Sequence, residues 1–164
     1  MIEEYPEIAL ERFDKANIWI KYIIIKIKKF LQDDILEVGA GCGSFTKSYM
    51  KKFESITLTD MDENSFNLLK KIFSDEKKIK ILKCNTKDIG KKFNTLLYFN
   101  VLEHIKDDKL EIKDALDKLN IGGHLIILVP AHQKIYSKLD KAVGHYKRYE
   151  IDFFKENKFE NSEI

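Results

Sequence analysis

The sequence predicts an α/β fold in which a mainly parallel, twisted sheet carries helices on both faces. Short runs of apolar and β-branched residues alternate along the chain with longer segments whose apolar residues have helical spacing. The run 95–100 is almost entirely apolar, as a central parallel strand buried on both faces should be. The run 35–38 leads into Gly39, Gly41 and Gly43 and then into a helical pattern, which indicates a strand, a tight turn and the start of a helix.

Size, composition and charge indicate one globular domain. The 164 residues can bury a sizeable core but are too few for two domains of ordinary size. We therefore expect a single domain over 1–164, with an N-terminal helical cap over 1–31 and a core over 32–164. The net charge of +2 gives no general case for binding nucleic acid or an anionic membrane.

The cysteines and the apolar runs bear on the location of the protein. Cys42 and Cys84 provide neither a disulfide framework nor a zinc spacing, so we predict no metal site and a reducing, cytoplasmic location. Residues 1–11 are acidic and contain Pro6, which does not fit a secretory signal. No wholly apolar run approaches the length of a membrane span, so we expect no stable membrane insertion.

Apolar residues at helical spacing predict one helix, or a broken pair, over 10–31. Lysines beside Trp19 also fit a helix that lies on a membrane surface, but a helix that covers a sheet has the same pattern.

The three glycines suit a ligand that approaches the main chain closely. Glycine adopts positive φ and has no side chain to hold a ligand away. The free amides at the start of the next helix favour a carboxylate or phosphate. The dinucleotide fingerprint requires glycine or alanine where this chain has Ser44, and the chain has Gly-x-Gly-x-Gly instead.

That form, preceded by Leu-Glu-Val, resembles motif I of the class I S-adenosylmethionine (SAM) dependent methyltransferases. The resemblance implies a Rossmann-like fold with SAM as the cofactor, bound at Gly39, Ala40, Gly41 and Gly43. It also implies that Glu37 helps to fix the loop and the methionine amine of SAM. A glycine turn with a purely structural role is the alternative.

The second strand is expected to supply the ribose-binding residue. The run 56–60 ends on Asp60, about twenty residues after the first glycine, where a carboxylate can accept from both ribose hydroxyls. Capping the next helix is the alternative role of Asp60. The resemblance places Met61 on the adenine, with a gap-filling core methionine as the alternative.

A third strand over 79–84 leads to the expected adenine-binding residues. Asn85 stands where the family has an acid that contacts the adenine amine, and its side-chain carbonyl can still accept from that amine. Thr86 beside it belongs to the same expected cofactor site. Asp88 is the alternative partner of the amine, or a turn residue.

The fourth strand ends in Asn-Val-Leu-Glu-His, a string close to one that recurs at this place in the family. Asn100 therefore falls where cofactor and acceptor should meet. His104 could orient an acceptor or take its proton, or serve as a structural hydrogen-bonding residue. We then predict a helix over 107–119, a stop at 120–123 and a fifth strand over 124–130.

Residues 131–149 form a long segment without a strong period, which is usually functional in a compact domain. They resemble the "PAH…LD…GHYRRY" segment of bacterial methyltransferases of the methyltransferase-12/23 type, which borders the acceptor pocket. The resemblance implies that His145 and Arg148 read an anionic or hydroxylated acceptor, with His132 and Tyr136 on the other wall. A loop held by its own hydrogen bonds is the alternative.

The end of the chain departs from the family pattern. We predict a short helix over 151–157 and the start of a sixth strand over 158–164, and no counterpart of the usual C-terminal antiparallel strand. The sheet would then expose an edge. A truncated chain, an oligomer or partner chain that covers the edge, or a shortened homologue would each explain this.

The predicted function is transfer of the SAM methyl group, by direct displacement, to an oxygen or carbon atom of a small molecule. The fourth strand is not followed by an Asn-Pro-Pro-Tyr-like motif, which argues against amino-group methylation of DNA or glutamine, and we expect no nucleic-acid partner. A SAM-binding subunit that lacks catalysis or depends on a partner is one alternative. An NAD-dependent oxidoreductase is another, although Ser44 conflicts with it.

Overall fold

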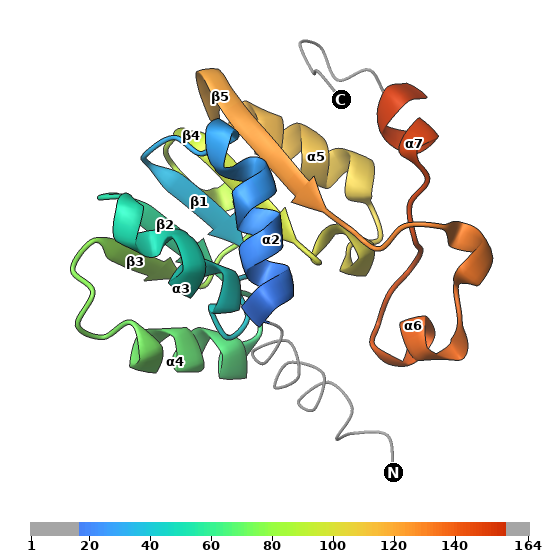
Figure 1. Cartoon of the computed structure of the whole chain (residues 1–164), viewed down its shortest axis with the longest axis horizontal. Helices are drawn as coiled ribbons and strands as arrows, with labels where there is room; N and C mark the ends of the chain where they lie inside the picture. Colours follow the sequence, from blue (N-terminus) through green and yellow to red (C-terminus); the bar gives the residue numbers. More distant parts are fainter. Residues whose placement is uncertain (1–16, 157–164) are drawn as a thin grey trace.

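The computed structural model describes residues 17–156, whose arrangement is shown in Figure 1. The part of the predicted first helix before residue 17 and the predicted sixth strand over 158–164 lie outside these residues.

Five parallel strands form one sheet in the order β3-β2-β1-β4-β5. The strands are β1 (Ile35–Val38), β2 (Ile56–Thr59), β3 (Ile79–Leu82), β4 (Phe93–Phe99) and β5 (Leu119–Leu128). The chain builds outward from β1 to β3 and then returns to place β4 on the other side of β1. This Rossmann-like order confirms the predicted fold class. Within residues 17–156 the sheet contains no antiparallel strand.

Helices cover both faces of the sheet (Figure 1). The α-helices are α2 (Asn17–Ile27), α3 (Ser44–Tyr49), α4 (Glu63–Ile72), α5 (Asp108–Asp117), α6 (Lys138–Ala142) and α7 (Ile151–Glu156). The 3₁₀ turns are η1 (Lys28–Phe30), η2 (Met50–Lys52), η3 (Thr86–Asp88), η4 (Leu102–His104) and η5 (Gln133–Ile135). Side chains of α2, α3 and α4 pack in the core on one face, and those of α5 pack on the other.

Successive residues of β1 supply these two cores, because side chains alternate across a strand. Ile35 lies in the core under α2, α3 and α4, whereas Leu36 lies in the core under α5, and both are fully buried. Burial of each such side chain contributes about 1.5–3 kcal/mol. The β1 strand is therefore held in the middle of the molecule, with its carboxyl end leading into the glycine loop.

Helix α2 is a covering helix, as one of the two interpretations of its sequence predicted. Its Ile20 is buried, and Ile23, Ile24 and Ile27 pack against the core. No helix in the described part of the chain is both long and apolar enough to cross a membrane.

Strand β5 begins at Leu119, so the predicted start at His124 was wrong, and α5 ends at Asp117. The predicted stop at 120–123 lies inside the strand. The reason is an irregularity in the pairing with β4, whose register shifts between Phe93 and Thr95. Gly122 has φ +78° there, and a Cβ on Gly123 would lie 2.9 Å from the Asn94 carbonyl oxygen, so glycines permit the bulge.

Candidate cofactor and acceptor site

The glycine loop joins β1 to α3 at the carboxyl end of the sheet. Gly39, Gly41 and Gly43 all have positive φ, of 63°, 56° and 70°. The amide of Ala40 donates to the Thr59 carbonyl at 3.0 Å, which ties the loop to the end of β2. The backbone of the loop is therefore fixed before any ligand binds.

Two of these glycines are also required by the packing of the protein itself. A Cβ on Gly39 would lie 2.7 Å from a methyl carbon of Val101, and a Cβ on Gly43 would lie 2.5 Å from the Phe73 ring. From the sequence, we explained these glycines by a ligand that approaches the main chain closely. Close approach of the segments that follow β4 and α4 is a second reason for glycine at these two positions.

Glu37 is a buried carboxyl group that connects β1 to α3. Its Oε2 accepts hydrogen bonds from the hydroxyls of Thr46 and Tyr49, each at 2.6 Å. Burial raises the pKa of Glu37 to about 7, against the lowering effect of these two hydrogen bonds. The contacts hold α3 behind the glycine loop. The predicted contact between Glu37 and the methionine amine of SAM stays a prediction.

Asp60 connects the glycine loop to the turn after β2. One carboxylate oxygen accepts from the Gly41 amide at 2.9 Å, and the other accepts from the Asp62 amide at 3.0 Å. Burial raises the pKa of Asp60, while the two amides act in the opposite direction. Asp62 caps α4 by accepting from the Ser65 amide at 2.8 Å. The capping role therefore belongs to Asp62, and Asp60 keeps acceptor capacity for a ligand.

The three residues predicted to be at the adenine have different surroundings. Met61 is 53% exposed, so it does not fill a gap in the core. Asn85 is exposed, and its amide nitrogen donates to Asp88 at 3.3 Å, which leaves its carbonyl oxygen as an acceptor. Thr86 is buried, and its hydroxyl contacts Tyr98 at 2.9 Å and Glu111 at 2.7 Å. The side chain of Thr86 therefore belongs to an internal network.

The chain turns sharply at the carboxyl end of β4. Asn100 has φ +55°, a conformation that residues other than glycine rarely adopt, and its amide donates to the Leu128 carbonyl at 2.8 Å. Strained backbone of this kind is concentrated at functional sites. The turn leads into η4, which carries Glu103 and His104.

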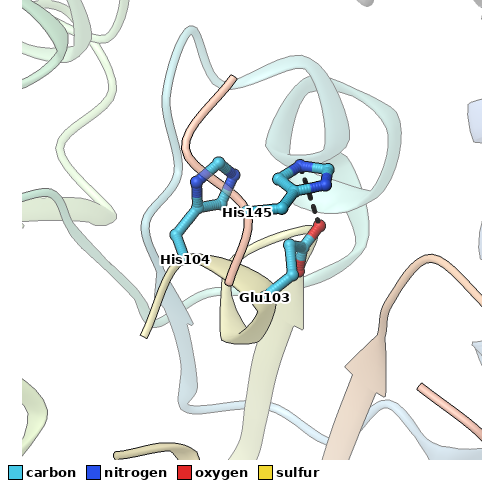
Figure 2. A group of neighbouring side chains, drawn as sticks. All are labelled: Glu103, His104 and His145. Carbon is cyan, nitrogen blue, oxygen red and sulfur yellow. Dashed lines mark ion pairs between the residues drawn. The ribbon is translucent and has the colours of Figure 1, made fainter. Parts of the chain in front are cut away.

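The loop after β5 brings His145 against His104. Figure 2 shows the two rings beside Glu103, and the ring centroids lie 4.7 Å apart at an angle of 83°. His145 Nδ1 lies 3.1 Å from Oδ1 of Asp140, which also accepts from Arg148 Nε at 2.8 Å. Burial acts to raise the pKa of Asp140, but hydrogen bonds from Arg148, Ser137 and His145 outweigh it and hold that pKa well below its usual range.

His132 and Tyr136 do not join this cluster. His132 is exposed, and its Nδ1 lies 3.7 Å from a carboxylate oxygen of Glu150. The Tyr136 hydroxyl donates to the His145 carbonyl at 2.7 Å and so supports the loop. Five residues were predicted on the acceptor side: His104, His132, Tyr136, His145 and Arg148. The structure brings His104 and His145 together, and Arg148 shares the Asp140 carboxylate with His145.

The loop is anchored to η4 and α5. Tyr149 is buried, and its hydroxyl lies 2.8 Å from an Asp108 carboxylate oxygen and 3.1 Å from the Leu102 carbonyl. The Tyr146 amide donates to the Glu103 carbonyl at 2.8 Å. Internal hydrogen bonds therefore do hold the loop, and they also present His145 to His104.

Sequence reasoning assigned no role to Glu103 or Asp140, although both lie in strings that it singled out. Both side chains are buried, at 1% and 2% exposure. The sequence feature that could have marked Glu103 as functional is its position next to a histidine just after a buried strand. Asp140 follows a serine by three residues, which is the spacing of the capping box that it forms with Ser137.

The parallel sheet, the glycine turn after β1 and the acid after β2 define a class I, Rossmann-like domain of the kind that binds a nucleotide-type cofactor. A family model described as a methyltransferase domain matches residues 36–125. The chain belongs to this methyltransferase family, which confirms the class predicted from the glycine loop and SAM as the cofactor of that class.

Individual relatives agree with this class. An rRNA adenine N-6-methyltransferase from Bacteroides fragilis is 24% identical over 147 residues, which cover 88% of this chain and 54% of that protein. The chain thus spans about half the length of the curated relatives it matches.

Solved structures have the same fold. The N-methyltransferase NodS from Bradyrhizobium japonicum WM9, in complex with S-adenosyl-L-homocysteine, aligns with a TM-score of 0.61 at 16% identity, over 74% of this chain and 63% of that chain. The YcgJ protein from Bacillus subtilis aligns with a TM-score of 0.68 at 12% identity, over 84% of this chain and 64% of that chain.

Proposed function

We propose that this chain binds SAM at the carboxyl ends of β1 and β2 and transfers its methyl group to an oxygen or carbon atom of a small molecule. The contact between Asp60 and the Gly41 amide is the observation that carries the proposal. It joins the acid that suits a ribose to the loop that suits the methionine end of SAM. Family membership favours this cofactor over NAD.

The reaction is a direct displacement. The bond between the methyl carbon and the sulfonium sulfur breaks as a bond to the acceptor atom forms, and the acceptor gives up a proton. The protein contributes mainly by aligning the three atoms and excluding water. We assign the cofactor side to the glycine loop, Glu37 and Asp60, and the acceptor side to Asn100 and the paired His104 and His145.

A second candidate acceptor is an adenine of RNA. The curated relative from Bacteroides fragilis is an rRNA adenine methyltransferase, and this observation favours a nucleic-acid acceptor. The net charge of +2 and the absence of an Asn-Pro-Pro-Tyr-like motif after β4 favour a small molecule. A third possibility is that the chain binds SAM as a subunit but does not itself catalyse methyl transfer.

The cofactor is tested by calorimetric titration of the purified chain with S-adenosylhomocysteine. We expect a Kd on the order of micromolar, corresponding to roughly 8 kcal/mol. Asp60→Ala should abolish this binding, whereas the matched control Asp62→Asn, which keeps an N-cap residue on α4, should retain it. No binding by the folded wild-type chain would remove the cofactor assignment.

The acceptor is tested with SAM labelled on its methyl group. The chain is incubated with the small-molecule fraction and, separately, with the ribosomal RNA fraction of a cell extract. Label that appears in small molecules and is lost in Asp60→Ala supports the proposal. Label in RNA favours the second candidate, and binding without any transfer favours the subunit that lacks catalysis.

A further inference from the structure

Glu103, His104 and His145 offer a set of metal-ligating atoms at the carboxyl end of β4 (Figure 2). One nitrogen of each histidine and one oxygen of the carboxylate lie within 4.8 Å of one another. The carboxylate and one imidazole come from η4, and the other imidazole comes from the loop after β5. Two imidazoles and a carboxylate are a donor set that proteins use for Zn²⁺ and for other first-row divalent ions.

The carboxylate of Glu103 lacks a partner that would explain its burial. The side chain is 1% exposed, and its Oε2 has no hydrogen-bond partner among the residues that the structure describes. Its other oxygen lies 4.0 Å from His145 Nε2. An unsatisfied buried polar group destabilises the fold, and more so if it is charged. A cation between Glu103 and the two imidazoles would remove this cost.

The histidines are oriented as metal ligands usually are. The contact of His145 Nδ1 with Asp140 favours the tautomer that carries its hydrogen on Nδ1, so the lone pair of Nε2 is directed toward Glu103. The Nδ1 atom of His104 lies close to Gly144, since a Cβ added to this glycine would be 3.5 Å from it. A carboxylate or a backbone group on the far side of a ligating imidazole fixes its tautomer and raises its basicity.

We propose that Glu103, His104 and His145 bind a divalent transition-metal ion, for which Zn²⁺ is the best match. Donor atoms on one such ion lie about 3–4 Å apart, so small rotations of these side chains complete the site. Three protein ligands leave at least one coordination position for another molecule. Cysteine spacing gave no sign of the site, because its ligands are histidine and glutamate from distant parts of the chain.

The location of the ion would allow it to bind the methyl acceptor, a role that rests on the proposed methyl transfer. The cluster follows Asn100 and lies at the end of the sheet where the strand order reverses between β1 and β4. A hydroxyl oxygen of the acceptor in the open position would be held near the cofactor, and its pKa would be lowered.

The metal site is tested in the absence of SAM and of any acceptor. The full chain is treated with EDTA, dialysed and titrated calorimetrically with ZnCl₂, and in parallel with MgCl₂. We expect one equivalent of Zn²⁺ to bind and Mg²⁺ to bind far more weakly. Glu103→Gln and His104→Ala should each weaken Zn²⁺ binding by about 100-fold or more, since loss even of an outer partner typically costs 10–100-fold.

Controls separate this site from incidental binding by histidine. His132→Ala removes an exposed imidazole that also lies near a carboxylate, and it should leave Zn²⁺ binding unchanged. Circular dichroism in the absence of metal checks that each variant is folded. Absence of Zn²⁺ binding by the wild type, or equal binding by folded Glu103→Gln and His104→Ala, would overturn the proposal. Titration with S-adenosylhomocysteine tests the cofactor site independently.

Discussion

Glu37 shows how one buried side chain makes the stability of this fold depend on pH. Its carboxyl group is surrounded by the core and receives two hydroxyl hydrogen bonds, yet burial raises its pKa from 4.5 to about 7. The folded chain therefore keeps a proton that the unfolded chain releases. The stability that this proton contributes is fully present below pH 4.5 and is lost as the pH rises to about 7.

Glu37→Gln tests this dependence. The amide does not titrate, but its carbonyl oxygen can still accept from Thr46 and Tyr49. We expect the unfolding free energy of the variant, relative to the wild type, to increase by roughly 3 kcal/mol between pH 4.5 and pH 8. Urea denaturation of both proteins across this range measures the difference, and the effects of other titrating groups cancel. A difference that does not change with pH would contradict the raised pKa.

Some single residues were predictable from the sequence and others were not. The place of Asp60 beside the glycine loop was predictable, because its position after a short strand and its distance from the glycines constrain it. Its binding of ribose stays a prediction. The pairing of His104 with His145 was not predictable, because it depends on the path of a loop that has no period. Burial of Glu103 was equally hidden, since the string Val-Leu-Glu-His-Ile gives no sign that a later segment will cover its acid.

The glycine loop is an element whose sequence is constrained from both sides. Its backbone has left-handed φ values that favour glycine, and Gly39 and Gly43 lie close to Val101 and Phe73, which follow β4 and α4. The same loop must remain open toward the carboxyl ends of the strands if it is to receive a cofactor. Packing and binding therefore select for glycine at the same positions.

Two alanine substitutions separate backbone strain from packing. Gly43→Ala places a Cβ against the buried Phe73 ring, whereas Gly122→Ala has a similar φ but no atom within 4 Å. We expect Gly122→Ala to cost about 1–2 kcal/mol from strain alone. Gly43→Ala should cost about 2–5 kcal/mol, because overpacking is added. Chemical denaturation measures both, and equal losses would show that Phe73 moves aside freely.

The spacing of apolar residues predicted most helices and strands, but it did not predict where β5 begins. The motif Gly122-Gly123 is typical of a turn, and it was interpreted as the stop between α5 and the strand. In the structure the Phe93 amide donates to the Lys118 carbonyl at 2.8 Å, so pairing with β4 begins before the glycines. A neighbouring strand supplies these hydrogen bonds, and the local sequence does not indicate which strand will lie beside it.

At the scale of the whole molecule, β5 forms one edge of the sheet within residues 17–156. Ile121 on this strand is fully exposed. Unpaired strand edges with apolar side chains promote pairing with other chains. We therefore expect a second copy of this chain to bind at this edge.

Light scattering after size-exclusion chromatography tests this association. We expect a molar mass above that of one chain at high protein concentration, and a shift toward the monomer in Ile121→Lys, because a charged side chain opposes edge pairing. The variant should keep its fold, since this side chain makes little contact with the core. A monomer mass for the wild type at every concentration would exclude the edge as an interface between copies of this chain.

The position of β1 in the sheet also determines when the surroundings of the glycine loop can form during synthesis. Ile35 pairs with Ile56 on one side and with Thr95 on the other, and Thr95 leaves the ribosome long after both of them. Contacts between distant segments slow folding, because the chain loses entropy before they are made. The pairing of β1 with β4 is thus a late product of folding, and a nascent chain that stops before β4 would carry the glycine loop without the strand that lies beside β1.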